Sequence, residues 1–484
     1  AFKKPFVMST SSVSHLIICS LILAPNVALC EEDHLSNSGR LIQASSLHYA
    51  QTVQSLERPK IRLVKPPINI ELERAFNRKN DSDRGVKLFL PPPPPPVDPA
   101  VPRIAILLPL TGQHKKLGQS MLNAAQLALF HFADTQFELL PKDTQGTERG
   151  ALDAIALAIG DGASLILGPL FAGSVAAVAP AARAAGVKVI AFSNDQRIAG
   201  DGVFTMGFLP REQVRRVVNY AITQGRRRFA VLAPKNDYGF AIVSALEKVA
   251  IEMGVNVVEQ AFYDPQVSDF GPVIKNLANY DERREELLEE RRLLEARDDD
   301  VAKRALKKLE NLQTKGNVSF EALLIADGGK TLEAIAALLP YYDIDKNKIK
   351  MLGTGHWDLP GIGSEPALVG GWFAAPPADG RREFENQYSS VFGASPPRLA
   401  TLAYDATALA AVFAQTDKGA REETSKSAYT VSALVARHGF KGLDGVFRFT
   451  SKGFAERGLS VFQVGERNNK VISQAPQVFE VDLK

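Results

Sequence analysis

The stretch from residue 103 to residue 129 constrains the fold more than any other part of the chain. It begins with an apolar run from Ile104 to Leu110, which Thr111 and Gly112 follow directly. This pattern is typical of a buried parallel strand that ends in a turn. Beyond the turn, apolar residues recur at helical spacing, at Met121, Ala124, Ala125, Ala128 and Leu129. The stretch therefore predicts a strand that delivers a polar loop at its carboxyl end, where open α/β sheets bind ligands.

Strands and helices continue to alternate along the rest of the chain. Further strands are predicted at 164–168, 187–192, 228–233, 255–261 and 322–326, with helices at 175–185, 211–224 and 240–253. A strand, a helix and a second strand at this spacing indicate right-handed crossovers and parallel sheets. Because 484 residues are too many for one compact domain, we expect an α/β protein with two similar lobes.

Residues 1–30 are predicted to be an export signal. Two lysines precede an apolar run that is too short to span a bilayer comfortably, and the run leads to Val-Ala-Leu-Cys at 27–30. Two processing routes stay open: Cys30 is the lipidated cysteine of an outer-membrane lipoprotein, or cleavage after Cys30 releases a soluble protein. Both routes place the protein in the periplasm, and the absence of cysteine after Cys30 suits an oxidising compartment.

Residues 31–100 are predicted to be an unstructured tether. Apolar residues are scattered without a period, and 58–87 holds nine basic and four acidic residues. Six consecutive prolines at 91–96 favour a stiff polyproline II spacer, which rises ~3.1 Å per residue. The segment either holds the body away from a membrane or is a plain linker, and the membrane is reached only through the lipid anchor.

A charged segment, 281–310, interrupts the α/β pattern with 20 charged residues in 30. Leu287, Leu294 and Val301 are spaced by seven, and the acidic run at 298–300 is typical of an N-cap and first turn of a second helix. Asp299 with Lys303 and Asp300 with Arg304 are further expected to form favourable i,i+4 pairs. We expect a helical hairpin, which is either a solvated insertion or a docking arm for a protein partner.

Motifs of enzymes, metal sites and nucleic-acid binders are not found. The four histidines after residue 100 form no pair at metal-ligand spacing, and there is no G-x-S-x-G elbow. Gly328–Thr331 lacks the earlier glycine of a phosphate loop, and Asp358 stands where 353–358 would need the third glycine of a dinucleotide loop. With a net charge of +3, nothing points to nucleic acid. We therefore expect no catalytic residues, no cofactor and no metal.

The chain resembles the type I periplasmic binding proteins of the leucine-binding type. The resemblance rests on Pro-Leu-Thr-Gly at 109–112 followed by Gly118, and on 443–449, Gly453 and 459–464, which are similar to the closing hairpin and last strand of that family. It implies two Rossmann-like lobes whose chain crosses between them three times, near residues 210, 373 and 438. The first lobe would then be 101–210 with 373–437. The second would be 211–372 with 438–484, and would carry the charged hairpin insertion at 281–319.

Candidate ligand-contacting residues lie at the predicted strand ends, where they would line the cleft between the lobes. They are Thr111, Leu170, Phe171, Ala172, Ser193, Asn194, Asp195, Tyr238, Asp327, His356, Trp357 and Asp358. The resemblance implies that first-lobe hydroxyls and backbone amides hold the carboxylate of an amino acid, while a second-lobe acid and tyrosine hold its ammonium group.

Several of these positions depart from the family pattern. Ala172 stands near the place of a family serine, and the Asp195 carboxylate would repel a ligand carboxylate. Tyr238 does match, and Asp358 is the candidate for the second-lobe acid. Alternatively, Phe171 and Trp357 pack the lobes and Asp195 caps a helix.

Two functions remain open. The helix at 122–129 and the strand at 137–143 are similar to those of the penicillin-binding protein activator family, whose members stimulate peptidoglycan synthases. The tether, the anchor, the charged hairpin and the altered pocket favour such an activator, with a synthase as partner. Against it, better-known members carry a helical-repeat domain for which 31–100 is too short. The alternative is a substrate-binding receptor of an importer for amino acids or related small solutes, which closes by hinge motion on its ligand.

Overall fold

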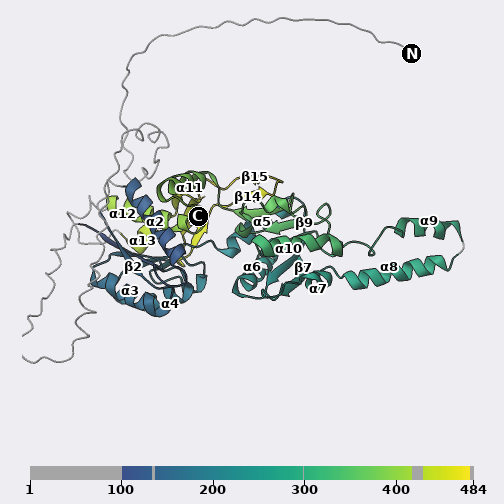
Figure 1. Cartoon of the computed structure of the whole chain (residues 1–484), viewed down its shortest axis with the longest axis horizontal. Coiled ribbons are helices and arrows are strands. Elements are labelled where there is room, and N and C mark those ends of the chain that lie inside the picture. Colours follow the sequence, from purple (N-terminus) through teal and green to yellow (C-terminus); the bar gives the residue numbers. More distant parts are fainter. Residues whose placement is uncertain (1–100, 133–136, 298, 417–428, 480–484) are drawn as a thin grey trace, which may run out of the picture. The chain divides into compact units, whose positions relative to one another are not determined.

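The computed structural model describes residues 101–484 except for 133–136, 298, 417–428 and 480–484 (Figure 1). The predicted export signal, Cys30 and the tether therefore lie outside the described residues. Within the described part, no helix is both long enough and apolar enough to span a bilayer.

The first lobe is built on a parallel sheet of five strands in the order β2-β1-β3-β4-β5. Its strands are β1 (Arg103–Leu108), β2 (Glu138–Asp143), β3 (Leu165–Leu167), β4 (Lys188–Ala191) and β5 (Val203–Thr205). Its helices are α2 (Lys115–His131), α3 (Glu148–Gly160), α4 (Ala172–Ala184), α11 (Asp379–Phe392), α12 (Ala400–Thr416) and α13 (Val431–Leu434), with the short helix η1 (Gln196–Ile198).

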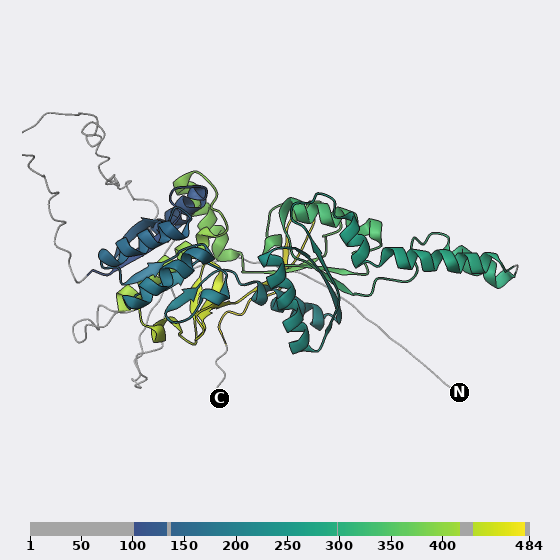
Figure 2. The same cartoon turned by 90° about the horizontal axis from the view of Figure 1, so that it is seen from below.

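Both faces of this sheet are buried, which explains the continuous apolar run of β1. Ile104, Ile106 and Leu108 pack into a core with residues of α2, α11 and α12, while Ala105 and Leu107 pack into a core with residues of α3 and α4. Successive side chains of a strand point to opposite faces, so each core receives every second residue. Helices cover both sides of the sheet (Figure 2).

The second lobe is built on a sheet of seven strands in the order β15-β14-β10-β9-β8-β6-β7. Its strands are β6 (Arg228–Pro234), β7 (Asn256–Tyr263), β8 (Ala322–Ile325), β9 (Lys350–Gly353), β10 (Trp372–Ala375), β14 (Ser460–Gln463) and β15 (Lys470–Ser473). Its helices are α5 (Pro210–Thr223), α6 (Asp237–Met253), α7 (Gly271–Leu277) and α10 (Gly329–Leu338), with the short helices η2 (Leu339–Tyr342), η3 (Gly355–Trp357) and η4 (Ile362–Ser364). The strands β6 to β10 are parallel, and β14 and β15 close the sheet with antiparallel pairs.

A third, antiparallel sheet belongs to the first lobe, which corrects one expected boundary. It consists of β11 (Phe440–Gly442), β12 (Gly445–Phe449) and β13 (Ala455–Arg457). Phe447 and Phe449 are buried in the core of the first lobe, and the Phe449 ring lies 5.2 Å from that of Phe204. The third crossing therefore falls at 458–459, between β13 and β14, and not near 438. The other crossings fall at 206–209 and 376–378, close to the expected 210 and 373.

The charged segment forms two helices, α8 (Tyr280–Glu295) and α9 (Asp300–Leu309), that follow α7 (Figure 1). As expected from the acidic run, Asp299 caps α9, and its side chain accepts a hydrogen bond from the Ala302 backbone N–H at 2.8 Å. The pairing differs from the expected i,i+4 pairs. The Asp299 carboxylate pairs with Arg297, and the Arg304 side chain donates to the Asp300 backbone carbonyl at 3.1 Å.

Candidate functional site

The loop after β1 is held by a carboxylate at the end of the neighbouring strand β2. Asp143 accepts hydrogen bonds from the Thr111 hydroxyl at 2.6 Å, the Leu110 backbone N–H at 2.9 Å and the Gln145 backbone N–H at 2.8 Å. Partial burial raises the pKa of Asp143, but these hydrogen bonds outweigh it and leave the pKa below its usual range. The Thr111 hydroxyl is thus engaged by the protein itself.

The spacing between this loop and α2 has a steric cause at Gly118. A Cβ added there would lie 2.1 Å from the carbonyl oxygen of Pro109, so α2 can pack this closely on the loop only through a glycine. The loop and the start of α2 are therefore fixed relative to each other.

The loop after β3 offers apolar contacts and no hydroxyl. Leu170 is buried in the first-lobe core, and the Phe171 ring packs against the same core and lies 4.7 Å from the His114 ring. Ala172 is the first residue of α4, and Phe171, at the N-cap, makes no side-chain capping hydrogen bond. This placement favours the packing interpretation of Phe171.

The loop after β4 is closed on itself. The Asp195 side chain accepts from the Arg197 backbone N–H at 2.9 Å and pairs with the Arg197 guanidinium at 2.7 Å, so it caps η1. These contacts with Arg197 hold the pKa of Asp195 below its usual range. Ser193 is buried and accepts a hydrogen bond from the Asp195 backbone N–H at 3.1 Å, whereas Asn194 is exposed. The capping interpretation of Asp195 agrees with this geometry.

Four second-lobe strands bring a polar aromatic cluster together at their carboxyl ends. The Tyr238 hydroxyl and the Thr354 hydroxyl share a hydrogen bond of 2.8 Å, and the Tyr238 and His356 rings stack with centroids 4.3 Å apart. Burial raises the pKa of Tyr238 to about 12. Loss of hydration lowers the pKa of His356, so a neutral imidazole is favoured at neutral pH.

Asp327, at the end of β8, is also held within this cluster. The Tyr263 hydroxyl donates to one of its carboxylate oxygens, and the Gly328 backbone N–H donates to the other at 2.7 Å. Burial and the bonded carboxylate together raise the pKa of Tyr263, which stays protonated. The carboxylate therefore already has two donors from the protein.

Trp357 lies in the second-lobe core and not on a surface. Its side chain is fully buried, and a Cβ added at Gly353 would lie 2.1 Å from its indole ring. Its ring centroid is 6.5 Å from that of Phe373. This placement favours the packing interpretation over ligand contact.

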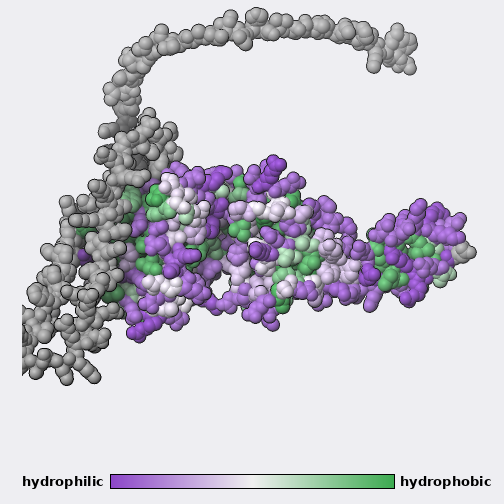
Figure 3. Space-filling model, in the orientation of Figure 1, coloured by the Kyte–Doolittle hydropathy of each residue, from purple (hydrophilic) through white to green (hydrophobic). Residues whose placement is uncertain are grey.

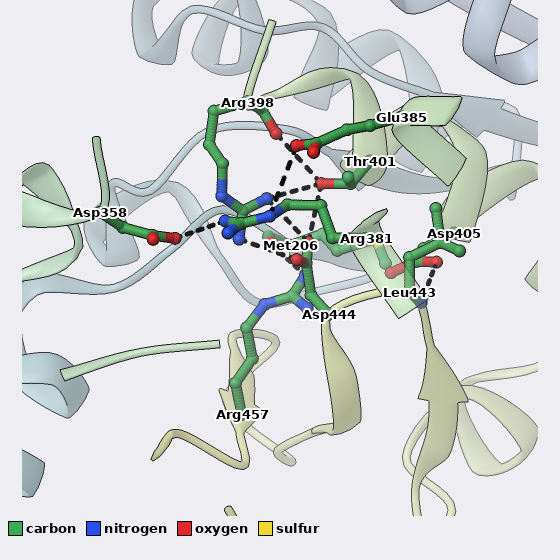
Figure 4. A network of polar contacts seen from close by, with 10 residues as sticks. All are labelled: Met206, Asp358, Arg381, Glu385, Arg398, Thr401, Asp405, Leu443, Asp444 and Arg457. Carbon is green, nitrogen blue, oxygen red and sulfur yellow. Dashed lines mark hydrogen bonds and ion pairs between the residues drawn. The ribbon is translucent and has the colours of Figure 1, made fainter. Parts of the chain in front are cut away.

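Asp358 forms an ion pair with Arg381, and the pair joins the two lobes (Figure 4). Asp358 follows η3 in the second lobe, whereas Arg381 lies on α11 of the first lobe. The side chains are only 13% and 11% exposed, and a second carboxylate, Glu385, lies 3.5 Å from Arg381. Burial opposes the charged guanidinium, but the Asp358 carboxylate still holds the pKa of Arg381 above its usual range.

A buried network of charges lies beside this pair and contacts the first crossing at Met206 (Figure 4). Arg398 donates to the Asp444 carboxylate at 2.7 Å, and the Arg457 guanidinium donates to the Met206 backbone carbonyl at 2.8 Å. Burial and the charge of Asp444 raise the pKa of the fully buried Asp405 to about 7. Asp405 also accepts a hydrogen bond from the Leu443 backbone N–H at 2.8 Å. These contacts fix the connections between the lobes.

The strand-end residues are thus largely engaged with one another. Thr111 bonds to Asp143, Asp195 pairs with Arg197, and Asp358 pairs with Arg381. Sequence reasoning missed the partners Asp143, Tyr263, Thr354 and Arg381. For Asp143 a signal existed, since it ends the predicted strand 137–143. Tyr263 lies two residues beyond the predicted strand 255–261, and nothing in the sequence marks Arg381. Among the described residues, no group of three or more His, Cys, Asp or Glu side chains is arranged to hold a metal.

Comparison with known proteins agrees with this architecture. A family model described as periplasmic binding protein matches residues 102–470. The chain is similar to a putative branched-chain amino acid ABC transporter protein of Rhodospirillum rubrum, with a TM-score of 0.61 and 19% identity over 77% of this chain and 100% of that one. At this identity the likeness shows the fold alone.

Two curated relatives share shorter segments. An uncharacterized protein of Rickettsia prowazekii is 23% identical over 176 residues, which are 36% of this chain and 47% of that protein. The penicillin-binding protein activator LpoA of Vibrio cholerae is 28% identical over 149 residues, which are 30% of this chain and 24% of the activator. The matches thus span less than half of the length of either relative.

Proposed function

The chain belongs to the periplasmic binding protein family, and we propose that it is a non-enzymatic regulator in the cell envelope that activates peptidoglycan synthases. Family membership and the similarity to the activators support a periplasmic location. Anchoring at the outer membrane through a lipid on Cys30 is part of the proposal.

The observation that carries the proposal is the buried pair of Asp358 and Arg381. A receptor for free amino acids offers a carboxylate to the ligand ammonium group, and Asp358 is the candidate for that carboxylate. Here an arginine of the same chain already neutralises it. Removing one partner of a buried ion pair costs about 3–5 kcal/mol, so a ligand cation would have to replace Arg381 fully to bind at Asp358.

Two further observations support the same function. The chain is similar over 149 residues to a protein named as a penicillin-binding protein activator. The helical hairpin of α8 and α9 adds a surface that a solute receptor with two lobes does not need for ligand binding. An activator acts through protein contacts, so it can keep the fold without an open amino-acid site.

The second candidate is a substrate-binding receptor of an ABC importer for amino acids or related small solutes. It is favoured by Tyr238, which lies in the first turn of α6, just after β6, where the family resemblance expects a ligand-binding tyrosine. In this structure the Tyr238 hydroxyl bonds to Thr354. A ligand would have to replace this hydrogen bond and the two hydrogen bonds that Asp327 accepts with contacts of its own.

A thermal-shift and calorimetric screen of the purified chain with the twenty amino acids separates the two candidates. The proposal expects no saturable stabilisation, together with a faster rate of glycan synthesis when the chain is added to a purified peptidoglycan synthase. A ligand at one hundred times its Kd would stabilise the fold by about 2.7 kcal/mol. A stabilisation of that size by one amino acid would show that the chain is a solute receptor and would contradict the proposed activator function.

A further inference from the structure

The base of the helical hairpin is fastened by a buried arginine. The Arg283 guanidinium pairs with the Asp343 carboxylate at 2.6 Å and donates to the Thr314 hydroxyl at 2.8 Å. It also donates to the backbone carbonyls of Ala278, Lys315 and Gly316 at 3.1–3.2 Å. An arginine that satisfies this many acceptors holds α8 in one orientation on the second lobe.

The two helices of the hairpin are also fastened to each other. The Arg291 side chain donates to the backbone carbonyls of Leu309 and Leu312, so it caps the carboxyl end of α9. Leu287 is buried and Ala302 is fully buried. With the Asp299 cap at the other end of α9, the hairpin is a defined structural unit and more than a solvated loop.

The charges of the hairpin are segregated between its helices. The α8 sequence holds seven acidic and four basic residues, whereas α9 holds one acidic and four basic residues. Two of the α8 arginines, Arg283 and Arg291, turn to acceptors within the protein. All four basic residues of α9 are exposed. The hairpin therefore presents an acidic helix beside a basic one.

Apolar side chains are exposed on the same hairpin (Figure 3). Val301 is 63% exposed and Leu293 is 60% exposed. Val301, Arg304 and Lys308 follow one another at i, i+3 and i+7 along α9, which places them on one side of the helix. We call these three residues the α9 face. An apolar side chain next to two cations is typical of a contact surface for another protein.

We propose that the α9 face docks onto an acidic surface of the protein partner. The identity of that partner as a peptidoglycan synthase rests on the proposed function. A protein surface can match both the basic α9 and the acidic α8, because it can carry both signs of charge at defined places. An anionic bilayer attracts α9 but repels the acidic residues of α8, and it is for this reason the weaker candidate.

Binding of the full chain, without its predicted export signal, to a purified peptidoglycan synthase of the same organism tests the proposal. The substitution R304E/K308E is expected to weaken binding about tenfold or more at low salt, because it places two like charges against an acidic surface. The difference should shrink at 0.5 M NaCl, where charges are screened within about 4 Å. Charge-conserving R304K/K308R should bind as the wild type does.

K248E/K330E is the matched control, because it makes the same change of charge at two exposed lysines elsewhere on the second lobe. If circular dichroism shows that R304E/K308E does not fold, the binding measurement is made with R304Q/K308Q, which removes the two positive charges without reversing them. Equal binding of the synthase by the wild type and R304E/K308E would overturn the proposal that the α9 face is the docking surface. It would not contradict the proposed activator function. If the wild type binds no synthase, the function fails and the docking proposal fails with it.

Cosedimentation with vesicles of phosphatidylglycerol and phosphatidylethanolamine provides the remaining arm of the test. Vesicle binding that R304E/K308E abolishes, with synthase binding unchanged, would assign the α9 face to the membrane and overturn the proposal. The expected result is weaker synthase binding by this variant than by the wild type, with no vesicle binding by either protein.

Discussion

The Asp358 carboxylate lies buried against the Arg381 guanidinium, which reaches it from the other lobe. The two residues flank β10 and the crossing that follows it, so the pair closes a short loop of chain between the lobes. Because both side chains are nearly removed from water, each needs the other as its counter-charge. The pair therefore stabilises one arrangement of the lobes and also neutralises the acid that would bind a ligand cation.

Arg381→Ala is expected to lower the free energy of unfolding by about 3–5 kcal/mol, since it leaves the Asp358 carboxylate without its partner. Low millimolar guanidinium chloride should partly restore the melting temperature of this variant, because the ion can enter the vacated position. Wild type, and R381A with equal sodium chloride, provide the controls. The absence of rescue, with a melting temperature equal to that of the wild type, would show that the pair contributes nothing.

Gly118→Ala should destabilise the protein by about 1–3 kcal/mol, the usual effect of forcing an extra methyl group into a filled space. The added Cβ would meet the Pro109 carbonyl oxygen at 2.1 Å, so the loop or α2 must shift. Gly160→Ala is the control, because no atom lies within 4 Å of a Cβ at that helical position. Urea unfolding curves of the two variants measure the difference, and equal midpoints would contradict the close packing of the loop.

The raised pKa of the buried Asp405 should make the free energy of unfolding depend on pH. Its pKa is about 7 in the folded protein and lies near 3.9 in an unfolded chain. A raised pKa stabilises the fold below the unfolded value, and this contribution is lost as the pH rises from about 4 through about 7. Burial raises the pKa of the neighbouring Asp444, but the charge and hydrogen bonds of Arg398 leave it below its usual range, so the extra proton is expected at Asp405.

Asp405→Asn should remove that slope. The wild type is expected to gain melting temperature relative to the variant as the pH falls from 8 to 5, by an amount corresponding to a few kcal/mol at most. Thermal unfolding of both proteins in matched buffers measures the difference. A difference that does not vary with pH would show that the Asp405 carboxyl group is ionised throughout this range.

Arg283→Lys is expected to loosen the base of the helical hairpin without unfolding the lobes. Lysine cannot reproduce the hydrogen bonds of the guanidinium to Thr314, Gly316 and Asp343. Backbone amides of α8 and α9 should then exchange with deuterium at least several-fold faster, while those of β6 and β8 keep their rates. Arg284→Lys, at an exposed position, is the control. Unchanged exchange rates in R283K would show that Arg283 does not anchor the hairpin.

The alternation of strands and helices in the sequence predicted the two α/β lobes, because buried parallel strands require continuous apolar runs. The Asp299 cap was likewise predictable, since capping is local. The place of 440–457 was not, because Phe447 and Phe449 fit an apolar core of either lobe equally well by pattern. The partner of Asp358 could not be predicted either, because no local sequence pattern indicates a contact with an arginine 23 residues further along the chain.

The rate of glycan synthesis by a purified peptidoglycan synthase shows whether this protein is an activator. Addition of the full chain without its predicted export signal should raise the initial rate in a saturable manner, and free amino acids should leave that stimulation unchanged. An unchanged synthase rate, together with saturable binding of an amino acid by the wild type, would show that the protein is a solute receptor and not an activator.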